Sequence, residues 1–347
     1  MPSLLRFFGL LVLGLFLTAP APAADFLAVS IAVDATGQST SQAREKALSD
    51  GQQQAFRRLL ESLTISSDHA RLPHPANWQD WVVDFSVDQE KTSAVRYLAL
   101  LTVRFKAQPV RNLLKQAGIA FAETASKPSL VIPILVQPGR PLLWDEDNLW
   151  LKAWQERPKL STLAPVLAPM GDNWDRQTFD VGSDKDRLEA MGRRYGAVQA
   201  LVAEAKPSQN GLDIRLLYGS GATAQIAVQA QAKDQPQAVF RKGADLVALH
   251  LEEAWKKNNL LVSESSGMLL VTASFNGLND WLRIRDRLAK VNLVRRQEIL
   301  EVARNQATLA LHHAGDMAQL RTALAQADLV LTQDGQGGAV LSLSSQR

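Results

Sequence analysis

The chain has 347 residues, 46% of them hydrophobic, and a formal charge of +3 from 38 basic and 35 acidic residues. A charge so close to neutral gives no indication of nucleic-acid binding, and the absence of cysteine excludes disulfides, thiolate metal sites and a cysteine nucleophile. The length predicts two or three domains, and the hydrophobic content is sufficient for their cores.

The first 23 residues have the pattern of an export signal. The amino terminus and Arg6 supply positive charge, an apolar run extends from Phe7 to Leu17, and small residues stand at positions 21–23. Because a run this short falls below the roughly 20 apolar residues of a membrane-spanning helix, we predict cleavage before Ala24. An uncleaved membrane anchor is the alternative. After cleavage the protein is expected in the periplasm, with no transmembrane segment.

Residues 24–127 are predicted to form an amino-terminal α+β domain. A strand, "DFLAVSIAV", precedes a helix, "SQAREKALSDGQQQAFRRLLESL", whose small residues recur three or four positions apart. Two alternating runs within residues 82–106 flank a charged stretch, which is typical of a hairpin. The segment "PVRNLLKQAGI" then predicts a second helix that stops at Gly118. The predicted order is β-α-β-β-α.

Residues 128–262 are predicted to form a middle domain around a mixed sheet. The runs "SLVIPILV" and "TLAPVLAPM" are interpreted as parallel strands buried on both faces, and whether they are neighbours in the sheet stays open. A helix over residues 185–195 leads to the strand "AVQALVAEA", and two further strands form a hairpin before a long closing helix.

Residues 263–347 are predicted to form a carboxy-terminal domain with the order β-α-β-β-α-β, which is the ferredoxin-like arrangement. Its last strand segments, "DLVLTQ" and "AVLSLS", are separated by the turn signal "DGQGG". The fold class is therefore predicted to be α+β, in three small units.

Catalytic motifs are missing from the sequence. The five histidines do not have the helical spacing of a zinc protease, and neither a nucleophile elbow nor a phosphate-binding loop is present. Adjacent His312 and His313 would point to opposite faces of a strand. We therefore predict a protein that is not an enzyme and uses no metal or cofactor.

Two segments rich in tryptophan and acid remain as a candidate partner or ligand surface. Both follow strands interpreted as parallel, whose carboxyl ends meet where ligands gather in open α/β sheets. The candidate residues are Trp144, Asp145, Asp147, Trp150, Asp172, Trp174 and Asp175. The structural alternative, which we favour, is that Asp145 or Asp147 caps a helix from Asn148 while Trp150 and Trp154 pack in the core.

A second candidate surface is basic. Residues 281–296 carry Arg283, Arg285, Arg287 and Arg295, with Asp286 as the one acid among them. A solvated helix face is the simpler interpretation, and a surface for a partner, anionic lipid or polymer is the alternative.

The export signal, "AREKALSDGQQQAFRRLLESL", "LWDEDNLWLKAW" and "RYGAVQALVAEA" together resemble the domain-of-unknown-function 2066 family of exported proteobacterial proteins. More distantly, the order of units resembles the flagellar T-ring assembly protein, whose second domain is similar to the TolB amino-terminal domain. The chain differs from that protein in its third unit, which is predicted to be ferredoxin-like. The resemblance implies an envelope-associated protein that binds another envelope protein, and it assigns no catalytic residue.

Overall fold

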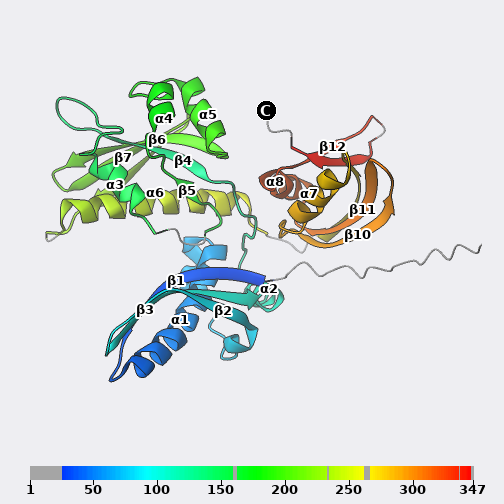
Figure 1. The fold of residues 1–347 in the computed structure, drawn as a ribbon, viewed down its shortest axis with the longest axis horizontal. Helices are drawn as coiled ribbons and strands as arrows, with labels where there is room; N and C mark the ends of the chain where they lie inside the picture. The colour runs from blue at the N-terminus through cyan, green and yellow to red at the C-terminus, as the bar shows by residue number, and fades with distance from the viewer. Residues whose placement is uncertain (1–25, 159–161, 233, 262–265, 336, 345–347) are drawn as a thin grey trace, which may run out of the picture.

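The computed structural model describes residues 26–158, 162–232, 234–261, 266–335 and 337–344. The predicted export signal and its cleavage site lie outside these residues. The chain is an α+β protein with three separate sheets, which confirms the predicted fold class (Figure 1). None of the described helices is long and apolar enough to cross a membrane.

The first unit, residues 26–118, is a three-stranded antiparallel sheet with a long helix on one face. The strands are β1 (Phe26–Thr36), β2 (Val82–Thr92) and β3 (Arg96–Lys106), in the order β1-β3-β2. The helices are α1 (Thr40–Leu63) and α2 (Ala107–Gln116). Small residues let α1 lie close to the sheet, since a Cβ on Gly51 would come within 2.6 Å of Val33 Cγ1. Two 3-10 helices, η1 (Ser66–Arg71) and η2 (Trp78–Trp81), connect α1 to β2.

The second unit, residues 129–258, is a five-stranded mixed sheet in the order β5-β4-β6-β7-β8. Its strands are β4 (Ser129–Leu135), β5 (Val166–Leu167), β6 (Gln199–Ser208), β7 (Gly211–Tyr218) and β8 (Thr223–Gln229). The helices are α3 (Leu149–Gln155), α4 (Asn173–Thr178), α5 (Lys185–Arg194) and α6 (Pro236–Asn258). Side chains of the fully buried β4 point alternately into two cores, one under α3 and α6 and the other under α5.

The prediction of a second buried parallel strand in "TLAPVLAPM" is wrong in part. This segment does pair in parallel with β4, but β5 has two residues at the edge of the sheet, and Leu167 is 37% exposed. Prolines at 165 and 169 flank it, and proline removes the amide that a longer central strand needs.

The third unit, residues 266–344, is a five-stranded sheet in the order β10-β11-β9-β13-β12. Its elements are β9 (Ser266–Ser274), α7 (Leu278–Leu288), β10 (Val294–Val302), β11 (Gln306–Ala314), α8 (Met317–Gln326), β12 (Leu329–Gln333) and β13 (Ala339–Leu343). The predicted β-α-β-β-α-β order is present, with β13 as an added strand. Because β13 lies parallel and next to β9, β12 is displaced to the edge.

A linking segment, residues 119–128, passes between all three units (Figure 1). Its main chain bonds to each of them: Ala122 N donates to Leu63 O, Thr124 O accepts from the Trp255 indole, and Lys127 N donates to the Gln326 side chain. A connection between domains is usually exposed, yet most residues of this segment are buried. The linking segment therefore joins the units through its own hydrogen bonds.

Candidate functional site

The loop after β4 places its tryptophans in the core. Asn148 caps α3, because its side chain accepts from Leu151 N at 3.0 Å, so the prediction that Asp145 or Asp147 supplies the cap is wrong. Trp150 is fully buried and donates its indole N–H to Ala203 O at 2.9 Å. Trp154 packs edge-on against it at 5.4 Å, as the four-residue spacing predicts.

Trp144 and Asp145 also serve the structure of this loop. The Trp144 side chain is 7% exposed and lies so close to Gly171 that a Cβ there would come within 2.6 Å of the ring. Its carbonyl accepts from Arg176 at 2.8 Å, which ties the two tryptophan-acid segments together. Asp145 accepts from Arg140 at 2.8 Å and from Leu143 N. Asp147 is exposed on the same loop.

Asp172 and Asp175 form a network with Arg194 at the start of α4. Asp172 caps the helix, and Arg194 pairs with both carboxylates, at 2.5 Å and 2.7 Å. Asp175 is fully buried and also accepts from the Tyr195 hydroxyl at 2.8 Å. The Arg194 guanidinium holds the pKa of Asp172 well below its usual range, while burial and then the Asp175 carboxylate raise the pKa of Tyr195 to about 12.

Trp174 is the exposed aromatic residue of this group. Its side chain is 40% exposed, and the Arg194 guanidinium lies 4.6 Å from the ring centre. Met170, two residues before Asp172, is 69% exposed. The structure thus brings Asp172, Trp174 and Asp175 together, and it leaves one aromatic and one aliphatic side chain facing outward.

The chemistry available to these acids is restricted by their partners. Asp175 is enclosed, both Asp172 oxygens face Arg194, and Asp145 faces Arg140. A general acid or base must be reachable by the proton that it moves. In the part of the chain that the structure describes, no group of three or more acids and histidines is placed to hold a metal ion.

The predicted basic surface is divided by the fold. Arg295 donates to the fully buried Glu123 at 2.8 Å, and Arg287 donates to Asp328 O at 2.9 Å. Arg283 pairs with Asp280 on the same helix. Arg285 is exposed. Three of the four arginines therefore serve contacts within the protein.

A buried charge cluster, which the sequence analysis missed, lies where the units meet. Glu123 in the linking segment is 0% exposed and is held by Arg111 of α2 at 2.7 Å and by Arg295 of the third unit. The Glu123 carbonyl also accepts from Asn292 at 3.0 Å. A local signal was present, since an acid stands within the apolar stretch "IAFAET".

Lys256 joins the first and second units in a similar way. Its side chain is 2% exposed, although it belongs to the last turn of α6. The ammonium donates to the carbonyls of Glu61 and Thr64 at 3.0 Å and 2.8 Å, where α1 ends. A cation is stabilised there because the carboxyl end of a helix carries partial negative charge. Neighbouring Glu253 accepts from Ser66 of the first unit.

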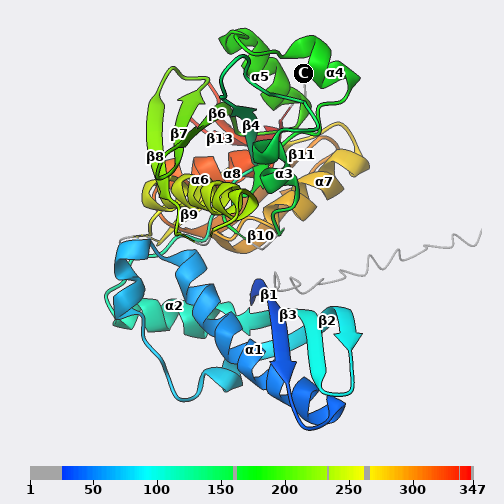
Figure 2. The same cartoon turned by 90° about the vertical axis from the view of Figure 1, so that its left-hand side faces the viewer.

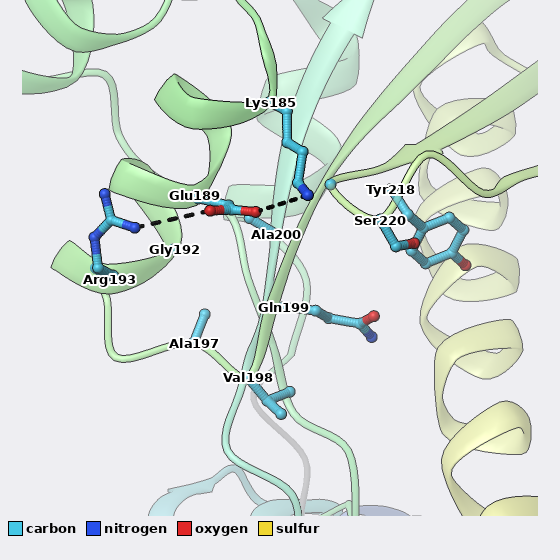
Figure 3. Close-up of a pocket in the computed structure, with 11 residues that line it drawn as sticks. Lys185, Glu189, Gly192, Arg193, Ala197, Val198, Gln199, Ala200, Tyr218 and Ser220 are labelled. Atoms are coloured by element: carbon cyan, nitrogen blue, oxygen red, sulfur yellow. Dashed lines mark ion pairs between the residues drawn. The ribbon is translucent and has the colours of Figure 1, made fainter.

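A cavity of about 470 Å³ lies between α5 and the adjoining ends of β6 and β7. Glu189 is paired there with Lys185 at 3.4 Å and with Arg193 at 3.9 Å. Figure 3 shows that the lining side chains diverge, with Arg193 and Tyr218 on opposite sides of the strands. In a ligand pocket the polar groups converge on one point, whereas those lining this cavity do not.

Comparisons of the chain with protein-family models, with curated proteins and with solved structures find no significant match. The resemblance to the domain-of-unknown-function 2066 family stays a prediction.

Proposed function

We propose that this protein is a non-enzymatic interaction or assembly factor of the cell envelope, which binds another envelope protein in the periplasm through the open sheet face of its third unit. The predicted export signal and the family resemblance support the location. The structural support is the distribution of exposed hydrophobic side chains, which carries the proposal.

These side chains are concentrated in the third unit. Among the described residues, 18 large hydrophobic side chains are exposed, and nine of them lie between Met268 and Val330. This unit holds less than a quarter of the chain. Six of the nine lie on strands, whereas Leu278, Leu282 and Met317 lie on the helices α7 and α8. Exposed apolar surface commonly marks a site of protein interaction when it is contiguous.

The open face of the third sheet is centred on β9. Met268 and Leu270 are 60% and 53% exposed, whereas Val271 and Ala273, on the helix-covered side, are buried. Opposite Leu270 on β11 stands Ala310, and opposite Met268 stands His312. The small Ala310 leaves Leu270 prominent, and methionine is enriched in interfaces.

A carbohydrate-binding or hydrolytic protein using residues 144–150 and 171–175 is the second candidate. The exposed Trp174, stacked with Arg194, favours it, because a flat aromatic surface beside polar groups suits a sugar. The engagement of Asp145, Asp172 and Asp175 with arginines weighs against it. We therefore place this function second.

Site-specific photocross-linking in living cells tests the proposal. Probes at Met268 and Leu270 should capture the same envelope protein, and Leu270→Ser should abolish capture from Met268. A probe at Ser86, which is exposed on β2, is the matched control and should capture nothing in common. The proposal fails if the β9 probes stay silent, or if Leu270→Ser leaves capture unchanged.

The second candidate has its own measurement. Retention of the purified protein on immobilised envelope glycans, lost on Trp174→Ala with the fold intact, would favour a carbohydrate-binding role. The interaction proposal predicts no such retention.

A further inference from the structure

The outermost strands of the three sheets differ in how they are protected against pairing. β5 and β12 have two and five residues, too short to template another strand well. β2 and β10 each contain two register shifts and carry several charged residues. At the end of β8, Lys242 donates to Gln229 O at 3.1 Å. Natural sheets use short strands, bulges and charges, lysine especially, to prevent pairing at an edge.

β1 has none of these protections. It has 11 residues and pairs with β3 without a register shift along its whole length. Its one charged residue, Asp34, is paired with Arg96. Among the described residues, no recorded hydrogen bond reaches the main chain of β1 from outside β3. Figure 2 shows β1 at one side of the sheet, followed by β3 and β2.

We infer that β1 pairs with β1 of a second copy of this chain, antiparallel, about a two-fold axis at Ile31. This register matches all 11 residues, since Phe26 then faces Thr36 of the other copy. It keeps both α1 helices on the same face of a continuous six-stranded sheet. This surface is separate from the open face of the third sheet, so the inference does not depend on the proposed function.

The side chains of β1 are complementary to themselves in this register. On the face under α1, Leu27 meets Ala35 and Val29 meets Val33, so apolar residues adjoin apolar residues. On the other face, Ser30 meets Ala32 and Ala28 meets Asp34, so no like charges oppose each other. The exposure of the strand fits as well: Val29 and Val33 are buried, while Ile31 between them is only half-buried. Pairing would cover Ile31 with its own copy.

The absence of cysteine gives a sharp test of the register. Directly opposed residues of antiparallel strands have Cα atoms about 4.5–5.5 Å apart, within the range of a disulfide. Ile31→Cys should therefore form a disulfide-linked dimer under mild oxidation. Ser30→Cys and Ala32→Cys should each stay monomeric on denaturing gels, whereas a mixture of the two should give a cross-linked dimer.

The mass of the native protein in solution provides the second measurement. The parent should sediment at twice the mass of one chain, and Ala32→Lys, which adds a charge to the exposed face of β1, should sediment as a monomer. Ser86→Lys on β2 is the control and should remain dimeric. A monomeric parent, a dimer that survives Ala32→Lys, or cross-linking of Ile31→Cys in cells to another protein instead of to itself would each overturn the inference.

Discussion

Two clusters of a buried acid and arginines show how differently the same chemistry is used in this protein. Asp175 and Arg194 lie 19 residues apart and fix the α4 and α5 segments of one unit. Glu123 and Arg295 lie 172 residues apart and join the linking segment to the third unit. Each carboxylate is 0% exposed. The first cluster stabilises a loop, whereas the second sets the positions of whole units.

Neither buried carboxylate is open to a substrate. A buried acid held by arginines and backbone groups has no room for a substrate, and its charge is already balanced. The proposed partner surface lies elsewhere, on the open face of the third sheet around Met268 and Leu270.

Removing the junction acid should have the largest effect. Glu123→Ala removes the buried carboxylate that pairs with the Arg111 guanidinium, and breaking such a pair costs about 3–5 kcal/mol. Urea unfolding should show this loss in the free energy of unfolding. Arg285→Ala, which replaces an exposed arginine of the third unit, is the control and should change the free energy of unfolding by less than about 0.5 kcal/mol. An equal effect of the two variants would contradict the role of Glu123.

Lys256→Met should cause the second-largest loss in the free energy of unfolding. Methionine keeps the apolar stem but removes the ammonium that donates to the carbonyls of Glu61 and Thr64, at a cost of about 3 kcal/mol. Hydrogen exchange should show faster exchange at both the end of α1 and the end of α6. Exchange that changes in α6 alone would mean that Lys256 does not couple the two units.

Asp175→Ala should cause a smaller loss in the free energy of unfolding, and its effect should be confined to one unit. It removes the acceptor of the Tyr195 hydroxyl and of Arg194, and we expect a loss of about 2 kcal/mol. Because the network lies within one unit, exchange should increase in α4 and α5 and stay unchanged at the linking segment. A change at residues 119–128 would show that the two clusters are coupled.

The smallest effect is a pH dependence at Glu253. Burial by itself raises the pKa of Glu253, but the Ser66 N–H and the Lys256 ammonium together lower it below its ordinary 4.5. A lowered pKa in the folded state adds stability above pH 4.5, and this stability is lost as the pH falls through the folded pKa. The difference in unfolding free energy between the parent and Glu253→Gln should therefore shrink below pH 4.5. A difference that is constant with pH would contradict the assignment.

The sequence predicted the class and most elements because hydrophobic periodicity is a local property. The stripe of α1, the continuous apolar run of β4 and the turn between β12 and β13 are all visible in short windows. It mispredicted β5, where prolines limit a strand that otherwise has suitable composition. It also placed the α3 cap on an acid, when the neighbouring Asn148 supplies it.

The buried charge contacts between the units were harder to predict, because their members come from distant segments of the chain. Arg295 belongs to a basic stretch and was therefore predicted to face solvent, yet its partner is Glu123. Lys256 adjoins the apolar stripe of α6, and only the end of α1 explains its burial. Conversely, Asp172 and Asp175 lie together, because the four residues from Asp172 to Asp175 span a single helix start.

Calorimetry tests the central claim, that the buried charges around the linking segment make three units into one body. A cooperative assembly unfolds in one transition, whereas independent domains unfold separately. The parent should show a single heat-absorption peak, and Glu123→Ala combined with Lys256→Met should split it into at least two. Separate peaks in the parent, or one unchanged peak in the double variant, would contradict the account.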